Sequence, residues 1–340
     1  MKAMILAAGE GTRLRPLTHY VPKAMVPVAN RPVMAHVLTQ LARHGLNEVI
    51  VNLHHMPEVI PGYFGDGSAF GVKLTYVRED QLWGTAGSVK RAADFFDDET
   101  FLVTGADDLA DVDLSYLLAR HRDKQSLATI GLAEVDDPSG YGIVATDVEG
   151  RITRFFEKPA PGEAFSNTAN TMIYFFEPEI LDLIPPGEIF DFARDLFPRL
   201  LAPRLPFFGF ISPGYWLDIG SLSDYLRAQS DLLSGQTSLP VPGTQRQPGV
   251  WVGEGGVVAP TAELVGPACI GDGSRLEEGV RIEAGTVIGN RCRIGAGARL
   301  RASVVWDGVE VPAGEILERE VRIPGGAVKV TPASEPDSVA

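Results

Sequence analysis

The alternation of apolar and polar positions divides the chain into two parts with different periods. From Met1 to about Leu233, short apolar runs typical of buried strands alternate with segments whose apolar residues fall at helical spacing. This order predicts an α/β domain with a doubly wound, mostly parallel sheet, in which ligands bind beyond the carboxyl ends of the strands. The predicted strands are MILA, EVIVNL, VKLTYV, FLVTG and LATIGLAEV.

One helix is predicted together with both of its ends. The segment RPVMAHVLTQLARHG, residues 31–45, has apolar residues at helical spacing. Asn30 stands where an N-cap is expected, and Gly45 lies just past the last periodic residue.

The second part of the chain is a hexapeptide repeat. Residues 234–249 are rich in Pro, Gly, Ser and Gln without apolar periodicity, so they are predicted to be a linker. Beyond them an aliphatic residue recurs every six positions, which predicts a parallel β-helix with one flat side per hexapeptide. A β-sandwich would instead space its strands irregularly, by about 8–12 residues. The recurring residues are Val252, Val258, Leu264, Ile270, Leu276, Ile282, Ile288, Ile294 and Leu300.

The repeat loses its phase after Leu300, because Trp306 takes the next aliphatic position and Pro312 the one after it. This predicts an atypical terminal coil. The expected domains are therefore 1–233 for the α/β domain and 250–326 for the β-helix, with a flexible tail at 327–340.

Composition and charge narrow the possible environments and partners. In 340 residues no apolar run approaches the roughly 18 needed to span a membrane, and the N-terminal run is too short for a signal peptide. We therefore expect a cytoplasmic protein with no membrane partner. A net charge of -14 argues against a nucleic-acid partner, which requires a basic face. The two cysteines, Cys269 and Cys292, are too few for a disulfide framework or a zinc site and are expected to be small buried fillers.

The stretch ILAAGEGTRLRPLT, residues 5–18, joins the first strand to a Gly-x-Gly turn. Such a turn lets backbone N–H groups approach phosphate oxygens, although a plain turn fits the glycines equally well. The Lys-Ser/Thr pair of a P-loop is missing, and Leu14 stands where a dinucleotide fingerprint has its third glycine. Cations gather in residues 1–31 of this acidic chain, where Glu10 is the one acidic residue, and this indicates a small polyanionic ligand. They are Lys2, Arg13, Arg15, Lys23 and Arg31.

Two aspartates are candidates for Mg²⁺, which takes one or two protein carboxylates when phosphates complete its coordination. Asp107 follows the strand FLVTG, and Asp218 lies in GYWLDIGS before a helix that begins at Ser221. Turn and capping roles are expected for three other acidic residues of the first loop, namely Asp108, Asp111 and Asp113.

These pieces, in this order, resemble the sugar-1-phosphate nucleotidylyltransferases over nearly the whole chain. The motifs that carry the resemblance are GEGTRLRPLT with PKAMVPV, LWGTAG, the Asp107 loop, YGIV, EKP, NTMIY, FPRLL, GYWLDIG and the trailing repeat. Among the subfamilies, VPVANRPVMAHVL, GTAG, SVVWDGV and the β-helix are most similar to mannose-1-phosphate guanylyltransferases. The resemblance implies a Rossmann-like mixed sheet followed by a left-handed β-helix.

The resemblance also implies a reaction and a set of site residues. The sugar 1-phosphate attacks the α-phosphorus of a nucleoside triphosphate and expels pyrophosphate, with Arg13 and Lys23 stabilising the developing charge and Mg²⁺ held by Asp107 and Asp218. The implied nucleotide-binding residues are Leu6, Ala8, Gly9, Gly11, Thr12, Glu79, Gly84 and Thr85. The implied sugar-phosphate-binding residues are Gly142, Glu157, Lys158 and Asn170.

Glu79 and Met172 bear on the choice of base and sugar. Glu79 occupies the position from which the family reads the base, and a carboxylate, which only accepts hydrogen bonds, suits the adjacent N–H donors of guanine. An alternative is that Glu79 points to solvent. Two departures from the family pattern bear on the pocket: Ala106 and Met172 stand where the family usually has glycine. Met172 has the greater effect, because a long side chain can reshape the sugar pocket.

Three alternative functions remain open. The first is a glucose-1-phosphate uridylyl- or thymidylyltransferase, and the second is a regulatory subunit that kept the fold and lost turnover. The third is an acyltransferase in the β-helix, which is disfavoured because all six histidines precede the repeat and such chemistry usually needs a histidine base. The exposed faces of a β-helix favour a homo-oligomer.

Overall fold

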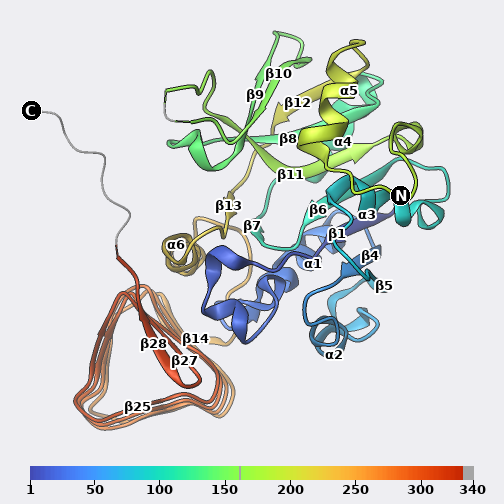
Figure 1. Ribbon diagram of the computed structural model, residues 1–340. Coiled ribbons are helices and arrows are strands. Elements are labelled where there is room, and N and C mark those ends of the chain that lie inside the picture. Colours follow the sequence, from blue (N-terminus) through green and yellow to red (C-terminus); the bar gives the residue numbers. More distant parts are fainter. Residues whose placement is uncertain (161, 332–340) are drawn as a thin grey trace, which may run out of the picture. The chain divides into compact units, whose positions relative to one another are not determined.

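The computed structural model describes residues 1–160 and 162–331, which form two compact units (Figure 1). The first unit contains Met1–Glu10, Val21–Ala24 and Val37–Trp216. The second contains Gly11–Tyr20, Met25–His36 and the residues from Leu217 onward. This grouping differs from the division expected from the sequence, which kept residues 1–233 together.

The first unit is built on a nine-stranded mixed sheet. Strand β1 lies between β4 and β6 and is parallel to both, and β4 is parallel to β5. Strand β11 runs antiparallel to β6, β8 and β9. The expected Rossmann-like α/β sheet is confirmed. The strands are β1 (Ala3–Leu6), β4 (Glu48–Leu53), β5 (Lys73–Arg78), β6 (Phe101–Gly105), β8 (Ala128–Glu134), β9 (Gly142–Thr146), β10 (Ile152–Glu157), β11 (Thr168–Phe176) and β12 (Phe207–Ile211).

An aromatic core lies beside this sheet. Phe96 stacks on Phe101 with ring centroids 4.0 Å apart, and Tyr174 packs against Phe192 and Phe197. Burying such large apolar side chains supplies most of the free energy that holds the strand ends in place. The helices of the chain are α1 (Val33–Arg43), α2 (Val59–Phe64), α3 (Thr85–Arg91), α4 (Leu114–Asp123), α5 (Phe197–Leu201) and α6 (Leu222–Leu233). Among the described residues, no helix combines the length and apolar character needed to cross a membrane.

The helix predicted at residues 31–45 is present but starts later. Arg31–Pro32 forms strand β3 with β2 (Pro27–Val28), so α1 begins at Val33 and Asn30 is not its N-cap. Asn30 has φ 62°, and its side chain donates to the backbone oxygen of Ile288 instead. Gly45 is confirmed as the residue past the helix end, where φ of 74° suits glycine.

The second unit contains the expected β-helix, and Figure 1 looks along its triangular coils. Hexapeptides fall in turn on three parallel sheets, and the aliphatic residues of the repeat fill the interior. One sheet is closed at both edges by an antiparallel strand, and we call it the capped sheet. Its strands are β14 (Thr244–Gln247), β15 (Val250–Val252), β18 (Ala268–Ile270), β21 (Thr286–Ile288), β24 (Val304–Val305), β27 (Glu320–Ile323) and β28 (Gly326–Lys329).

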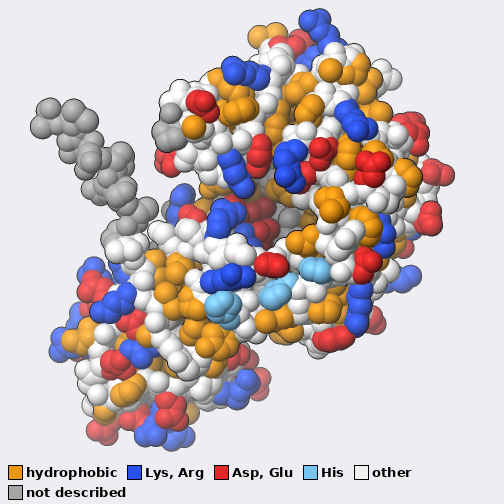
Figure 2. All heavy atoms as spheres, viewed as in Figure 1, with side chains coloured by type: hydrophobic (Ala, Val, Ile, Leu, Met, Phe, Trp, Pro, Cys, Tyr) orange, Lys and Arg blue, Asp and Glu red, His pale blue; other side chains and the backbone are white. Residues whose placement is uncertain are grey.

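The other two sheets, which we call the open sheets, carry charged side chains on their outer faces. Arg281 pairs with Glu263 at 2.7 Å, and Arg293 pairs with Glu277 at 2.7 Å. Figure 2 shows positive and negative side chains intermixed over this part of the surface. One open sheet consists of β16 (Val257–Val258), β19 (Arg275–Leu276), β22 (Arg293–Ile294) and β25 (Glu310–Val311). The other consists of β17 (Glu263–Leu264), β20 (Arg281–Ile282), β23 (Arg299–Arg301) and β26 (Ile316–Glu318).

The six-residue phase shifts after Leu300, as predicted, but the β-helix continues past this point. Ile270 pairs with Ile288, but Ile288 pairs with Val305, one residue before the position that the repeat predicts. Val305, Val311 and Leu317 then fill the interior in place of Trp306 and Pro312. A coil shorter by one residue, with Ala302 at φ 46°, therefore shifts the register and continues the helix.

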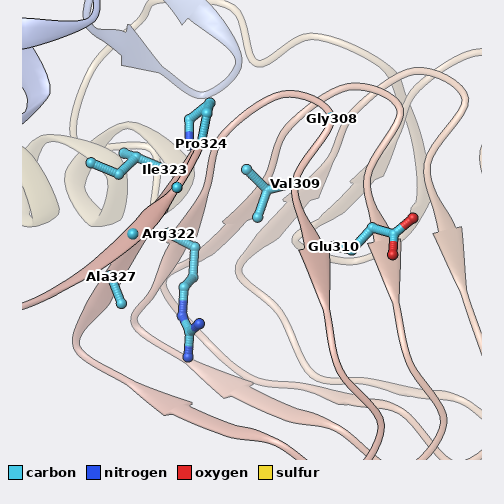
Figure 3. Close-up of a pocket in the computed structure, with 9 residues that line it drawn as sticks. Gly308, Val309, Glu310, Arg322, Ile323, Pro324 and Ala327 are labelled. Carbon is cyan, nitrogen blue, oxygen red and sulfur yellow. The ribbon is translucent and has the colours of Figure 1, made fainter.

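The predicted linker and tail are both partly structured. Residues 244–247 of the linker form β14, which runs antiparallel to β15. Residues 326–329 form β28, which pairs with β27, while residues 332–340 of the predicted tail lie outside the described part of the chain. Figure 3 shows an open pocket between this hairpin, with Arg322 and Ile323, and the coil turn at Val309 and Glu310.

His36 gives the fold a dependence on pH. It is fully buried in α1, its Nε2 contacts the Val28 carbonyl oxygen at 3.0 Å, and burial lowers its pKa to about 4, with Arg31 acting in the same direction. The unfolded chain takes up this proton near pH 6.5, so stability is lost as the pH falls below that value. We expect a loss of about 1.4 kcal/mol per pH unit between pH 6.5 and pH 4 from this residue.

Urea unfolding of the wild type and His36→Gln at several pH values measures this loss. The substituted chain, which takes up no proton here, should show a shallower decline in unfolding free energy below pH 6.5. Parallel declines for the two proteins would contradict the assignment.

Candidate functional site

The carboxyl edge of the parallel strands gathers several predicted residues. Leu6, at the end of β1, lies between Asn52 of β4 and Gly105 of β6 in register. The chain then continues through Ala8 and Gly9, and an added Cβ on Gly9 would meet no atom within 4 Å. The backbone at Gly9 is therefore open to a ligand on the side where a side chain would stand.

The rest of the glycine loop belongs to the second unit. Gly11 has φ 63° and ψ 37°, a left-handed conformation that favours glycine. Its carbonyl oxygen accepts hydrogen bonds from the Leu14 N–H at 3.0 Å and the Thr18 hydroxyl at 2.9 Å. These bonds close a tight turn with a 3-10 helix at Thr12–Leu14, on which the side chain of Arg13 is 60% exposed.

Each unit pairs a predicted phosphate-binding cation with a predicted metal-binding carboxylate. In the first unit the ammonium group of Lys23 contacts Asp107, which follows β6. In the second unit Arg13 Nη2 lies 3.7 Å from Asp218 Oδ2, just before α6. In each pair the two side chains contact each other, although the sequence analysis assigned the cation to phosphate charge and the carboxylate to Mg²⁺.

Glu79 does not point to solvent, because its side chain is 6% exposed. Oε1 accepts a hydrogen bond from Asn52 Nδ2 at 3.1 Å, and Asn52 Oδ1 accepts the Ala7 N–H at 2.8 Å. Among the described residues Oε2 has no hydrogen-bond partner, although it is enclosed. A buried carboxylate oxygen without a donor is costly, so this oxygen favours a ligand that brings an N–H group.

Gly84 and Thr85 fix the start of α3. Gly84 has φ 74°, and an added Cβ would lie 2.4 Å from the Phe190 carbonyl oxygen. The Thr85 hydroxyl donates to Asp191 at 2.9 Å and accepts the Phe192 N–H at 2.9 Å. The Thr85 side chain is therefore engaged within the fold.

Three of the residues predicted to bind the sugar phosphate meet where β9 and β10 pair. Gly142 lies opposite Glu157 in register, and an added Cβ on Gly142 would stand 2.6 Å from Glu157 Oε2. Lys158 Nζ lies 3.8 Å from Glu157 Oε1. Burial raises the pKa of Glu157, and the positive charge of Lys158 opposes that rise. The carboxylate and the ammonium group form one polar cluster over the glycine.

The fourth, Asn170, lies at a bulge in β11. Asn170 Oδ1 accepts the Met172 N–H at 3.1 Å, and Nδ2 donates to the Tyr174 hydroxyl at 2.8 Å. Met172 has φ 58°, which explains physically why glycine suits this position. The Tyr174 hydroxyl in turn contacts the Met172 sulfur at 3.1 Å, so the methionine side chain has a defined position beside Asn170.

Of the three acidic residues expected to act in turns and caps, only Asp113 does so; Asp108 instead begins strand β7 (Asp108–Ala110), and Asp111 bonds to a residue distant in the chain. Asp113 accepts the Tyr116 N–H as N-cap of α4, and Asp111 accepts the Tyr215 N–H at 2.6 Å. Ser221 is confirmed as the N-cap of α6.

The sequence interpretation missed Asn52, the residue that joins the glycine loop to Glu79. Its signal was available: a polar residue near the end of the apolar run EVIVNL, beside the strand that carries the loop. In the described part of the chain, no group of three or more His, Cys, Asp or Glu residues forms a ready metal site. A site of two carboxylates therefore needs phosphates and water to complete six ligands.

Comparison with known proteins agrees with the architecture. The Nucleotidyl transferase family matches residues 2–235, and the Bacterial transferase hexapeptide (six repeats) family matches residues 267–302. A UTP--glucose-1-phosphate uridylyltransferase from Synechocystis is 42% identical over 90% of this chain and 83% of its own length. A mannose-1-phosphate guanylyltransferase from Mycobacterium tuberculosis is 36% identical over 93% of this chain and 83% of its own.

Among solved structures, HddC from Yersinia pseudotuberculosis superimposes with a TM-score of 0.60 and 25% identity. The match covers 68% of this chain and 99% of the HddC chain. The range matched by the Nucleotidyl transferase family, residues 2–235, includes the glycine loop and both candidate aspartates.

Substitution by alanine should lower the stability of the protein at Gly84 but not at Gly9. Gly84→Ala forces a left-handed φ on alanine and a clash with Phe190, which should lower the unfolding free energy by at least about 2 kcal/mol. Gly9→Ala meets open space and should leave stability unchanged. Thermal unfolding of both variants measures the difference, and equal melting temperatures would show that the Gly84 geometry is wrong.

Proposed function

Because the chain belongs to the Nucleotidyl transferase family, we propose that this nucleotidyltransferase joins a nucleoside triphosphate, favouring GTP, to a sugar 1-phosphate, favouring mannose 1-phosphate. The products are a nucleotide sugar and pyrophosphate. The observation that carries the proposal is the pairing of Lys23 with Asp107 and of Arg13 with Asp218.

These pairs suit a site that waits for a polyanion and a cation. Without substrate, each cation neutralises a carboxylate. A triphosphate would draw Lys23 and Arg13 to its oxygens, and a divalent cation entering with it would take the two carboxylates. Each of these four side chains would therefore have an opposite charge beside it both before and after the substrate binds.

In the proposed reaction, an oxygen of the sugar 1-phosphate attacks the α-phosphorus. A new P–O bond forms while the bond to the leaving pyrophosphate breaks, so negative charge moves onto pyrophosphate. Arg13 and Lys23 stabilise this charge, and the open backbone at Gly9 and the turn at Gly11 hold the triphosphate. Mg²⁺ bound by Asp107 and Asp218 would neutralise phosphate charge.

The cluster at Glu157 supports the sugar-phosphate site. Lys158 holds the phosphate, and Glu157 accepts hydrogen bonds from sugar hydroxyls above Gly142, where a side chain would collide. Asn170 contributes its amide beside them. Met172 narrows the space next to Asn170 and is the residue by which this pocket differs from the family pattern.

Glu79 supports the preference for GTP. Its enclosed Oε2 lacks a donor among the described residues, and guanine offers adjacent N1–H and N2–H groups that a carboxylate can accept. Recognition by this oxygen requires the enclosing side chains to move aside as the base enters. The 42% identity to a protein named as a uridylyltransferase makes UTP with glucose 1-phosphate the competing outcome.

The cations and carboxylates also oppose a catalytically silent subunit, since a scaffold needs no such set. A homo-oligomer remains part of the proposal. Exposed aliphatic residues on and beside the open sheets, Val257, Val265 and Ile316, offer apolar contacts for a second copy.

Removing the charge of Arg13 tests the catalytic assignment. Arg13→Ala should lower kcat about 100-fold or more, because one preorganised donor to the transition state is lost, and should leave the melting temperature unchanged. The matched control is Arg246→Ala, an exposed arginine of β14 in the same unit, which should retain full turnover. Near-normal kcat in Arg13→Ala would remove the assignment.

A pyrophosphate-release screen tests the substrates. GTP, UTP, dTTP, ATP and CTP are each combined with mannose, glucose, N-acetylglucosamine and heptose 1-phosphates in Mg²⁺. We expect the highest kcat/KM for GTP with mannose 1-phosphate, and Glu79→Gln should reduce the preference for GTP over UTP by about 10- to 100-fold. A wild-type preference for UTP or dTTP would overturn the base assignment.

A further inference from the structure

The segment that carries Arg13 belongs to the same compact unit as the β-helix. Gly11–Tyr20 and Met25–His36 group with the residues from Leu217 onward, whereas Lys23 and Asp107 lie in the other unit. Arg13 and its partner Asp218 are therefore both residues of the β-helix unit. A change in the packing of the β-helix can thus alter the position of Arg13 without a change in the nine-stranded sheet.

The capped sheet is buried on its outer face as well as its inner one. The outward residues Cys269, Val287, Val304 and Val321 are each 1% exposed or less. On the open sheets the corresponding outward positions are exposed, whether they hold arginines such as Arg275, Arg293 and Arg299 or the aliphatic residues Val257 and Ile316. An apolar outer face must be shielded from water by other segments of the chain, which we call the cover, and the contacts of the capped sheet identify these segments.

Residues from the N-terminal segments and from α6 form the cover. Asn30 Nδ2 donates to the Ile288 carbonyl oxygen at 2.8 Å. Trp306, which follows β24, donates from Nε1 to the Tyr225 hydroxyl of α6 at 3.1 Å. The ring of Tyr20 meets the ring of Trp306 edge to face, with centroids 6.5 Å apart. The end of the Gly11–Tyr20 segment therefore contacts Trp306 through the ring of Tyr20, which remains 44% exposed.

Helix α6 ties the second N-terminal segment to the same place. The fully buried side chain of Gln229 accepts the Ala29 N–H at 2.7 Å and donates to the Pro27 carbonyl oxygen at 2.9 Å. The helix packs against both β2 and β21. It therefore lies between the capped sheet and the strand pair that precedes α1.

The Gly11–Tyr20 segment is compact enough to transmit the position of Tyr20 to Arg13. Leu14 and Leu17 are fully buried, and Thr18 bonds back to Gly11 at 2.9 Å. The guanidinium of Arg13, by contrast, is exposed and its pair with Asp218 is long, so that pair alone holds it weakly. The backbone of the segment must therefore set where Arg13 stands.

We infer that the capped sheet, through Trp306, holds the Gly11–Tyr20 segment in the conformation that presents Arg13. Trp306 is thus a positioning residue for the reaction, although it lies in the β-helix. The inference rests on the proposed function, which gives Arg13 its role. Its physical basis is that a donor to a transition state loses about 100-fold in rate when it is misplaced by about 1 Å.

The first test compares Trp306→Ala with Trp251→Ala by hydrogen exchange. Trp251 is the matched control, because it lies at the opposite end of the same sheet, beside Gln245 of β14. Trp306→Ala should accelerate amide exchange in residues 11–20, and Trp251→Ala should not. Unchanged exchange in residues 11–20 of a folded Trp306→Ala protein would overturn the inference.

The second test is a double-mutant cycle on turnover. Trp306→Ala should lower kcat about 10- to 100-fold with little change in KM, because Arg13 acts on the transition state. In an Arg13→Ala background the same substitution should cost little more, since it acts through Arg13. An equal loss in both backgrounds would show that Trp306 acts independently of Arg13 and would overturn the inference.

Two milder variants serve if Trp306→Ala does not fold. Trp306→Phe and Tyr225→Phe each remove the hydrogen bond between the two side chains and keep an aromatic ring, and each should produce the same changes in smaller measure. Failure of the proposed function is distinguishable from failure of the inference. Full turnover in Arg13→Ala contradicts the function assigned to Arg13, whereas hydrogen exchange in residues 11–20 judges the positioning by Trp306 directly.

Discussion

Two ion pairs, Lys23 with Asp107 and Arg13 with Asp218, are the interactions on which the proposed chemistry depends. The Arg13–Asp218 pair contributes little to stability, because the Arg13 side chain is 60% exposed. In the proposed function these pairs hold four charges in place, and the triphosphate and its metal would replace the protein partners of those charges. Each pair is carried by a different unit, and each unit therefore supplies one cation and one carboxylate.

The backbone explains why these charges stand at the ends of strands. The parallel register of β1 with β4 and β6 brings Leu6, Asn52 and Gly105 to one edge of the sheet. Asp107 follows that edge, and Asn52 links the backbone at Ala7 to the carboxylate of Glu79. The loop proposed to bind phosphate and the residue proposed to read the base are thus connected through one amide side chain.

Much of the architecture was predictable from short-range pattern. The strands, the end of α1 at Gly45 and the β-helix follow from local periodicity and from glycine conformation, which a sequence displays directly. The late start of α1 was not predictable, because the side chain of Asn30 donates a hydrogen bond to Ile288, a residue far away in the chain, and does not cap the helix. The change after Leu300 was visible in the sequence as a loss of the six-residue phase, but the sequence did not show that a coil shorter by one residue moves Val305 into the place assigned to Trp306 and lets the β-helix continue. The contacts of the site, such as Glu79 with Asn52, depend on strand register and had no local signal beyond residue type.

The burial of the capped sheet restricts how such a protein can be divided or recombined. A chimera joined at residue 234 would transplant the β-helix without Tyr20, Asn30 and Gln229, and its apolar outer face would meet a foreign cover. Exchange of the β-helix between relatives is therefore expected to succeed only when the N-terminal segments and α6 are transferred together with the coils. These parts form one structural unit that is discontinuous in sequence.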